Sequence, residues 1–557
     1  MVSTIREQCN RRLEGMKAVR KPYEQDWEEI NRLGMSTRNI HLGSNGRKNS
    51  RRANTSSQDS YARRAARTLG YGMQSGLSSS SMPWFKLKPG SAELSENQDV
   101  KEWLNIAETR IYAYFADTGV YDPFKLNYMD LGNYGVAASV MLEHPEYVGV
   151  THALTAGEYW IAADGGSRTD TLYRNVEYTV DNLVRTFGWE NVSKAAQQAW
   201  TNNKPQTIVP VVHAIERNHE RDPVKLSADN KEYRSVFYEP GNDDRNQLLR
   251  LNGYDSKPFW APRWEVMGGS VYSENCPGFD ALPDLREMQL TARRRGRARD
   301  MLHKPPMKAP TGLTAQPLKL DPGSINFASA TDLEGLEPVF RTDWQSLGAV
   351  REDHEAVRQD VAECYYNDLF KAISDREGVQ PLNDLETSLR NDEKFTQLGP
   401  IVDRVNVEML EVAVQRAFVI LTNTGIMPPP PRALQGQPLI IDFVSMLAQA
   451  QRSSSNSAIE RMARFVGFVA GIFPDAAIKF DAEQAIDEFA TGTGTPPKVV
   501  RSDEMVDKMK AELQQQKQQE QMAQMAGPMK DAAQGAELLS RTDVGGDQNA
   551  LQQLMGQ

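Results

Sequence analysis

A segment rich in proline and glycine, flanked by two long helical patterns, is the feature that most constrains the fold of this chain. The first pattern opens at Pro283 and runs to about His303, and the second runs from Ser346 to about Ser374. Between them, residues 304–344 include the run PPMKAPTGLTAQPLKLDPGS, whose composition is typical of short strands and turns. The sequence therefore predicts two long helices joined by a compact insert.

The second helical pattern carries a stripe of mostly apolar residues at alternating intervals of three and four. Its members are Leu347, Val350, His354, Val357, Val361 and Cys364. Such a stripe packs along another helix over a long contact. The partner is either the first helix of the same chain or a helix of a neighbouring copy, and the spacing leaves both open.

The two helical patterns carry opposite charges. The second has six acids, Glu352, Asp353, Glu355, Asp360, Glu363 and Asp368, against Arg351 and Arg358. The first has six arginines, namely Arg286, Arg293, Arg294, Arg295, Arg297 and Arg299. Complementary faces on neighbouring copies favour a closed ring, because head-to-tail interfaces close when the rotation permits. We expect Arg293, Arg294, Arg297, Val357 and Val361 at the subunit interface.

The rest of the chain alternates between helical and β patterns, which predicts an α+β fold that is predominantly helical. Helical patterns cover residues 1–40, 101–142, 385–424 (interrupted at Gly399–Pro400), 446–472 and 481–490. Strand patterns cover residues 147–151, 158–163, 171–180, 207–215, 233–238 and 259–266, with a turn at Gly165–Gly166. Residues 427–436 indicate an extended linker, and the glutamine-rich tail from 503 indicates a solvated helix that frays.

Charge and cysteine content limit the class of protein. The net charge of −10 over 557 residues argues against a protein that grips nucleic acid along its whole surface, but not against one that DNA passes through. Residues 43–67 are basic, and we interpret them as an exposed connection or as an arm that faces DNA or a scaffold. Three scattered cysteines favour a reducing compartment. No signal peptide or membrane span is expected.

No catalytic signature is found. The phosphate loop, dinucleotide fingerprint, zinc-protease and nucleophile-elbow motifs are all missing. His213 and His219 around Glu216 are interpreted as polar surface residues, and Ser78–Ser81 as a flexible loop. We therefore expect a protein that is not an enzyme and that needs no cofactor or metal.

An ordered series of segments resembles the portal (head-to-tail connector) proteins of short-tailed phages. The segment YSENCPGFDALPDLREMQL at 272–290 resembles that family's P-G-x-x-A-L-P-D passage. GNYGVAASVMLE at 132–143 and the segment 156–188 resemble its β-rich wing. The series continues in the expected order with 363–379, 398–421, 427–436 and 443–462. The resemblance covers about residues 5 to 510.

The resemblance implies a portal fold with a wing, a helical stem, a clip and a helical crown. It assigns 1–280 to the wing, 281–303 and 346–374 to the stem, and 304–345 to the clip. Residues 375–440 would hold a channel loop, a long kinked helix and the return to the wing. Residues 441–505 would form the crown, and 506–557 a flexible tail. The family forms rings, usually of twelve subunits, at one capsid vertex.

The resemblance also implies partners and site residues. Double-stranded DNA would pass through the ring, and terminase, a tail adaptor, capsid and scaffold proteins would bind it in the virion and, during assembly, in the host cytoplasm. For the DNA channel we expect Glu352, Glu355, Glu363, Lys371 and Arg376. For terminase or adaptor docking we expect Lys304, Lys308 and Lys319. The channel-loop region reads QPLNDLE at 380–386 and departs from the family's T-A-T-E segment.

Two rival classes differ from the portal interpretation. An internal core or scaffold protein of the virion would suit the glutamine-rich tail and the missing motifs. A nuclease or terminase subunit would need a carboxylate metal cluster or a phosphate loop, and the sequence offers neither.

Overall fold

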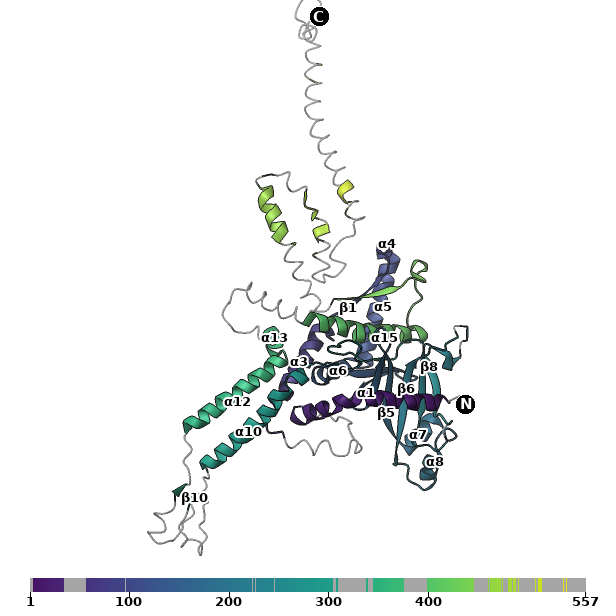
Figure 1. The fold of residues 1–557 in the computed structure, drawn as a ribbon. Coiled ribbons are helices and arrows are strands. Elements are labelled where there is room, and N and C mark those ends of the chain that lie inside the picture. The colour runs from purple at the N-terminus through teal and green to yellow at the C-terminus, as the bar shows by residue number, and fades with distance from the viewer. Residues whose placement is uncertain are drawn as a thin grey trace, which may run out of the picture. The chain divides into compact units, whose positions relative to one another are not determined.

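The computed structural model describes residues 4–34, 57–303, 307–308, 337–338, 344–374 and 398–444, apart from single positions within them, and scattered residues from 459 to 537. The chain separates into two units, Met1–Ser454 and Ser455–Gln557. Helices and strands both contribute to the first unit, which confirms the α+β class (Figure 1).

A five-stranded antiparallel sheet lies at the centre of the β-rich region. Its strands, in spatial order, are β4 (Tyr159–Ala163), β5 (Thr169–Thr179), β6 (Ile208–Arg217), β7 (Tyr233–Tyr238) and β8 (Arg250–Tyr254). Asp164 shapes the predicted turn between β4 and β5, because its Oδ1 accepts hydrogen bonds from the N–H groups of Gly166 and Arg168, both at 2.9 Å. Strand order therefore follows chain order, as in a meander.

Helices cover both faces of this sheet. Helix α1 (Ile5–Leu33) begins at a capping box of Thr4 and Glu7 and lies along one face (Figure 1). On that face Leu13 packs with Val212 of β6. On the other face Val211 packs with Leu183 of helix α7. The short helices there are α7 (Val180–Phe187) and α8 (Lys194–Thr201). Alternate residues of β6 thus belong to two different hydrophobic clusters.

A helical layer packs beside a second sheet of order β3-β2-β9. The strands are β2 (Ala138–His144), β3 (Val148–Leu154) and β9 (Phe259–Trp260). The helices are α3 (Tyr61–Leu77), α5 (Gln98–Asp117), α6 (Tyr121–Tyr134) and α15 (Glu411–Asn423). At Gly70 a Cβ atom would lie 2.4 Å from Met129 Cγ, so glycine allows α3 and α6 to approach closely.

Strand β1 (Phe85–Pro89), followed by α4 (Ala92–Ser95), pairs with β12 (Leu439–Phe443).

Two long helices flank the proline-rich insert, as predicted. They are α10 (Leu282–His303), which follows α9 (Pro277–Asp280), and α12 (Trp344–Cys364). Of the insert, the structure describes the two-residue strands β10 (Met307–Lys308) and β11 (Glu337–Pro338), which pair antiparallel. The predicted helix to Ser374 is interrupted: Tyr366 adopts a left-handed φ of 52°, and α13 (Asn367–Ser374) starts anew. Tyr365 is buried at this break and donates to Asn133 Oδ1 at 2.9 Å.

Several predicted boundaries were wrong. The helical pattern to residue 142 ends at Tyr134, because Gly135 caps α6 with a φ of 71°, and β2 follows. Of the predicted strand 259–266 only Phe259–Trp260 forms one. The described part of the predicted helix 385–424 begins at Leu398, next to the predicted interruption at Gly399–Pro400, and it contains an unpredicted π-helical turn at Asn406–Leu410. Helix α3 was not predicted either: its first residues, 61–67, belong to the segment that we interpreted as an exposed connection or arm, but Ala62, Ala65 and Ala66 are buried. Helices α7 and α8 and strands β1, β8 and β12 were also not predicted.

In the second unit the structure describes one longer helical run, residues 461–470, within the predicted helix 446–472. Most of the predicted helix 481–490 and of the tail lies outside the described residues. None of the helices in the described ranges is both long and apolar enough to cross a bilayer.

Candidate functional site

Helices α10 and α12 form an antiparallel hairpin within one chain. Thr291 lies 2.9 Å from His354 Nδ1, whereas Asp284, near the start of α10, lies 4.0 Å from Cys364 at the end of α12 (Figure 1). Val357 and Val361 of the apolar stripe are 7% and 0% exposed. The stripe thus packs along α10 of the same chain, and these two valines, which we had expected at the subunit interface, lie in the subunit's own core.

Six charged residues that the sequence analysis singled out are exposed on the hairpin. Arg293, Arg294 and Arg297 are exposed on α10, and Glu352, Glu355 and Glu363 are exposed on α12. Within the described parts of both helices, no ion pair joins an arginine of α10 to an acid of α12. Arg286 pairs with Glu29 of α1 at 2.6 Å. The hairpin therefore presents a basic and an acidic face whose charges are mostly unneutralised in one chain.

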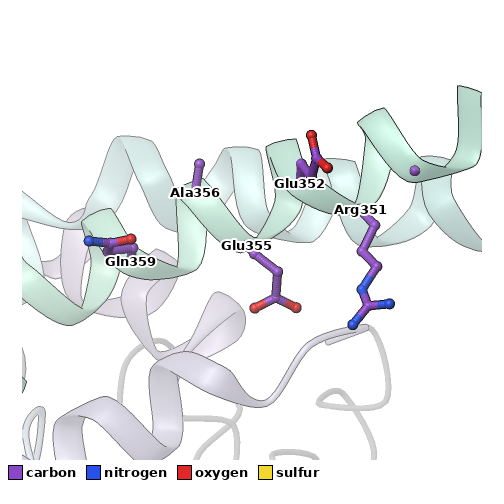
Figure 2. A pocket seen from close by; sticks show the side chains of 6 residues that line it. Arg351, Glu352, Glu355, Ala356 and Gln359 are labelled. Atoms are coloured by element: carbon purple, nitrogen blue, oxygen red, sulfur yellow. The ribbon is translucent and has the colours of Figure 1, made fainter. Parts of the chain in front are cut away.

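An open depression of about 580 Å³ follows the acidic helix. Gly348, Arg351, Glu352, Glu355, Ala356 and Gln359 line it, all from α12. Figure 2 shows Glu352 and Ala356 on one side of the helix and Arg351 and Glu355 pointing to the other. A Cβ atom at Gly348 would have no neighbour within 4 Å, so the depression is open to solvent at this point.

Buried polar residues attach the hairpin to the segment before α3. Asp59 Oδ2 lies 2.7 Å from His354 Nε2 and accepts from Arg358 Nε at 3.0 Å. Gln289 of α10 accepts from the Asp59 N–H at 3.1 Å and donates to the Asp59 carbonyl at 2.9 Å. His354 is fully buried and Asp59 is 6% exposed. Both helices are thus held by one residue of a distant segment.

The charge of Asp59 is stabilised in this setting. Burial raises the pKa of Asp59, but hydrogen bonds from the Tyr61 N–H and from Arg358, with the charge of Arg358, outweigh burial and hold the pKa below its ordinary value. The carboxylate therefore stays ionised between two helices at neutral pH.

The remaining predicted site residues are scattered. Lys371 is on α13, after the break at Tyr366, and Lys308 is on β10 opposite Glu337. Lys304, Lys319 and Arg376 lie outside the described residues. Of the three predicted docking lysines the structure describes Lys308 alone, so their shared docking role stays a prediction.

The interpretation of Glu216 and His213 as surface residues was wrong. His213 is 0% and Glu216 is 1% exposed. Glu216 accepts hydrogen bonds from Tyr173 at 2.8 Å and from Arg234 Nε at 3.0 Å, and it pairs with Arg12 of α1. His213 receives a 3.1 Å hydrogen bond from Arg174 and stacks on Phe237. Helix α1 covers the strand end that the sequence suggested was exposed.

A second buried ion pair involves the π-helical turn. Glu408 accepts from the Arg263 backbone N–H at 3.0 Å and from its guanidinium at 2.5 Å. Arg263 also donates to the carbonyl of Ser167 in the turn between β4 and β5. A π turn inserts one extra residue into a helix and reorients the side chains within it. Here the π turn contains Glu408, which lies against Arg263 of the β-rich region. The sequence did not suggest this contact.

No group of three or more His, Cys, Asp or Glu side chains in the described ranges could hold a metal ion.

The family model of the bacteriophage head to tail connecting protein matches residues 6–500. This chain belongs to that family. The portal protein of Salmonella phage epsilon15 is 33% identical over 552 residues, which cover 99% of this chain and 98% of the relative. The probable portal protein of Bordetella phage BPP-1 is 34% identical over 495 residues, 88% of each.

Membership in the connector family confirms two predictions made from the sequence. The chain has the portal function, and it is a structural protein rather than an enzyme.

Proposed function

We propose that copies of this chain form a closed ring, of twelve subunits as the family resemblance implies, which is the DNA channel at one capsid vertex. The observation that carries the proposal is the charge pattern of the hairpin. Within the described parts of the two helices, the exposed arginines of α10 form no ion pairs with the exposed acids of α12. In a ring, the basic face of one hairpin meets acids on one side of the next hairpin, and the acids on its other side remain for the channel.

Each part of the chain is assigned a region of the proposed ring. In this proposal α10 and α12–α13 (281–303 and 346–374) form the stem, and the insert 304–345 forms the clip. Residues 1–280 form the wing, and residues 375–440 supply the channel loop and the return to the wing. Residues 441–505 form the crown, followed by the flexible tail. The long antiparallel contact and the buried Asp59 anchor support a stiff projection that can carry the insert away from the wing.

The exposed residues then have distinct roles. Arg293, Arg294 and Arg297 contact the neighbouring subunit. Glu352, Glu355 and Glu363 face the channel at least in part, where they repel the phosphate backbone, while Lys371 and Arg376 provide sparse counter-contacts. Lys304, Lys308 and Lys319 of the insert dock the terminase and later the tail adaptor. Capsid and scaffold proteins bind the ring in the host cytoplasm during assembly and hold it at the capsid vertex in the virion.

Native mass spectrometry of the purified full chain tests this proposal directly. We expect one high oligomer or a narrow range of oligomers, formed without nucleotide or metal and unchanged by reductant. Negative-stain images should show an axial hole. A stable monomer at micromolar concentration, or a filament, would favour the internal core or scaffold protein instead.

A further inference from the structure

Helix α3 has an exposed side without a single acid. The helix reads YARRAARTLGYGMQSGL, and its buried side consists of alanine, leucine, methionine and glycine. Arg64, Arg67 and Tyr71 are exposed, and their spacing of three and four residues places them on one face. Tyr71 leaves 50% of its surface in contact with solvent. This face, called here the α3 stripe (Arg64, Arg67 and Tyr71), combines two cations with an aromatic ring.

The cations that border the stripe are already neutralised, whereas those within it are not. Arg358 on the α12 side is paired with Asp59 at 2.8 Å and Glu355 at 2.7 Å. Lys125 on the α6 side is paired with Asp122 at 2.7 Å. Arg64 lies over the Tyr61 ring at 5.3 Å and has no acid partner in the described residues, and neither does Arg67. Two arginines of the stripe are therefore available to an external anion.

The sequence before α3 extends the same charge. Residues 43–67 contain Arg47, Lys48, Arg51, Arg52, Arg63, Arg64 and Arg67, and their only acid is Asp59. Asp59 is already paired with His354 and Arg358. In a chain of net charge −10, this segment has a local excess of positive charge. Such a cluster is the electrostatic signature of a phosphate-rich partner.

The stripe borders the helix that enters the proposed channel loop. At Gly72, next to Tyr71, a Cβ atom would lie 2.1 Å from the ring of Phe370 on α13. Only glycine permits this approach, so α3 and α13 are in direct contact at this point. Helix α13 carries Lys371 and leads into residues 375–397. The stripe and the proposed channel cation Lys371 thus belong to two helices that touch.

We propose that Arg64 and Arg67 bind the phosphate backbone of double-stranded DNA, so that the α3 stripe is a DNA contact surface separate from the hairpin. This inference rests on the proposed channel function and adds a site to it. The hairpin acids repel DNA along its length, and the stripe supplies a small number of attractive contacts. Arginine forms two parallel hydrogen bonds to a phosphate, and a few such contacts hold the duplex without stopping its movement.

The test compares the double variant R64Q/R67Q with the wild-type full chain. The binding of a short fluorescent duplex is measured by anisotropy between about 50 and 200 mM salt. We expect about tenfold weaker binding at low salt and a salt dependence that is less steep by about one for each phosphate that is no longer bound. The reduction in affinity should be the same for two duplexes of unrelated sequence, because phosphates carry no sequence information.

The control is the double variant R11Q/R221Q, which removes two exposed arginines elsewhere and changes the net charge equally. It should bind the duplex as the wild type does. Native mass spectrometry of each variant reports ring formation separately. Rings that form normally but bind DNA with unchanged affinity would overturn the stripe as a DNA site and leave the proposed function intact.

Two other outcomes would also overturn the DNA assignment. If R64Q/R67Q no longer forms rings although R11Q/R221Q does, the stripe belongs to the subunit interface. If it forms rings, keeps its DNA affinity and is no longer incorporated into procapsids, its partner is an acidic capsid or scaffold protein. Failure of the wild-type chain to form rings would instead refute the proposed function.

Discussion

Glu216 holds a carboxylate that is almost completely removed from solvent yet remains charged. Burial raises the pKa of Glu216, but the hydrogen bond and charge of Arg234 and the charge of Arg12 outweigh it, so the pKa lies below its ordinary value of 4.5. A depressed folded-state pKa contributes stability that is present above the unfolded value and is lost as pH falls through the folded value. The Glu216 cluster therefore stabilises the fold at neutral pH and ceases to do so in acid.

The variant Glu216→Gln should lower the stability of the first unit by about 3 kcal/mol at pH 7, because Arg234 loses its partner in a buried site. Thermal unfolding measured from pH 7 to pH 3 checks the sign. The difference between wild type and variant should shrink as the pH falls below the ordinary glutamate pKa of 4.5 and through the lower pKa of the folded state, where the wild-type carboxylate itself becomes protonated. Glu220→Gln, an exposed neighbour, should change stability by less than about 0.5 kcal/mol. A constant difference across the whole pH range would contradict the ionic origin of the stabilisation.

Glu216 also shows what one sequence cannot reveal about single residues. Its strand was predicted within two residues, and its position at the strand end favoured solvent exposure. Exposure depends on α1, which begins about two hundred residues earlier and brings Arg12 over that end of the sheet. No local pattern carries this information. The same holds for Glu408, whose partner Arg263 is 145 residues away in sequence.

At the scale of elements, the sequence predicted the helical hairpin well. His354, Val357 and Val361 of the predicted stripe are buried, because a three-and-four spacing places side chains on one helix face whatever the partner. The break at Tyr366 and the π turn at 406–410 were missed. Both depend on tertiary contacts, of Tyr365 with Asn133 and of Glu408 with Arg263, and neither is marked by proline or glycine at the position of the irregularity.

The exposed acids of α12 admit two roles, and one variant separates them. Replacing Glu352, Glu355 and Glu363 by lysine should leave the hairpin folded, since all three side chains are exposed. If the acids face the channel, rings still assemble, bind duplex DNA more tightly at low salt and package it more slowly. Native mass spectrometry, a duplex-binding assay and a packaging assay report these effects. Loss of the ring in this variant would show that the acids contact a neighbouring subunit.

A charge-reversal pair tests the arginines of α10 in the same way. Replacing Arg293, Arg294 and Arg297 by glutamate should abolish rings, because the exposed face of α10 would then meet the acidic face of the next subunit with like charge. Combining this change with the three lysine substitutions on α12 should restore assembly if the two faces contact each other. Arg11→Glu is the matched control and should leave assembly unchanged. Rings that persist after reversal of α10 alone would refute the arginine interface.

For the molecule as a whole, the sequence predicted the order of segments along the chain. The assembly of several chains could not be read directly from one sequence. Helix, insert and helix follow a β-rich region, and this order with the resemblance led to the correct family. The proposed ring is a property of several copies, however, and in one chain only the exposed charges of the two helices support it. The docking lysines fall largely outside the described residues, so their role stays a prediction.

The proline-rich insert is the segment whose removal should separate assembly from packaging. Its prolines restrict the unbound backbone, so little entropy is lost when a partner docks. Replacing residues 304–344 by a short flexible linker should preserve the ring, because the α10–α12 contact through Thr291, His354 and the buried valines lies outside the insert. Native mass spectrometry should show the wild-type oligomer, while a packaging assay with purified terminase should show no DNA uptake, since the motor has no surface to engage.

Replacing residues 219–222, which follow β6, by a flexible linker of equal length serves as the control and should leave packaging intact. Normal packaging by the insert variant would place terminase docking elsewhere on the ring.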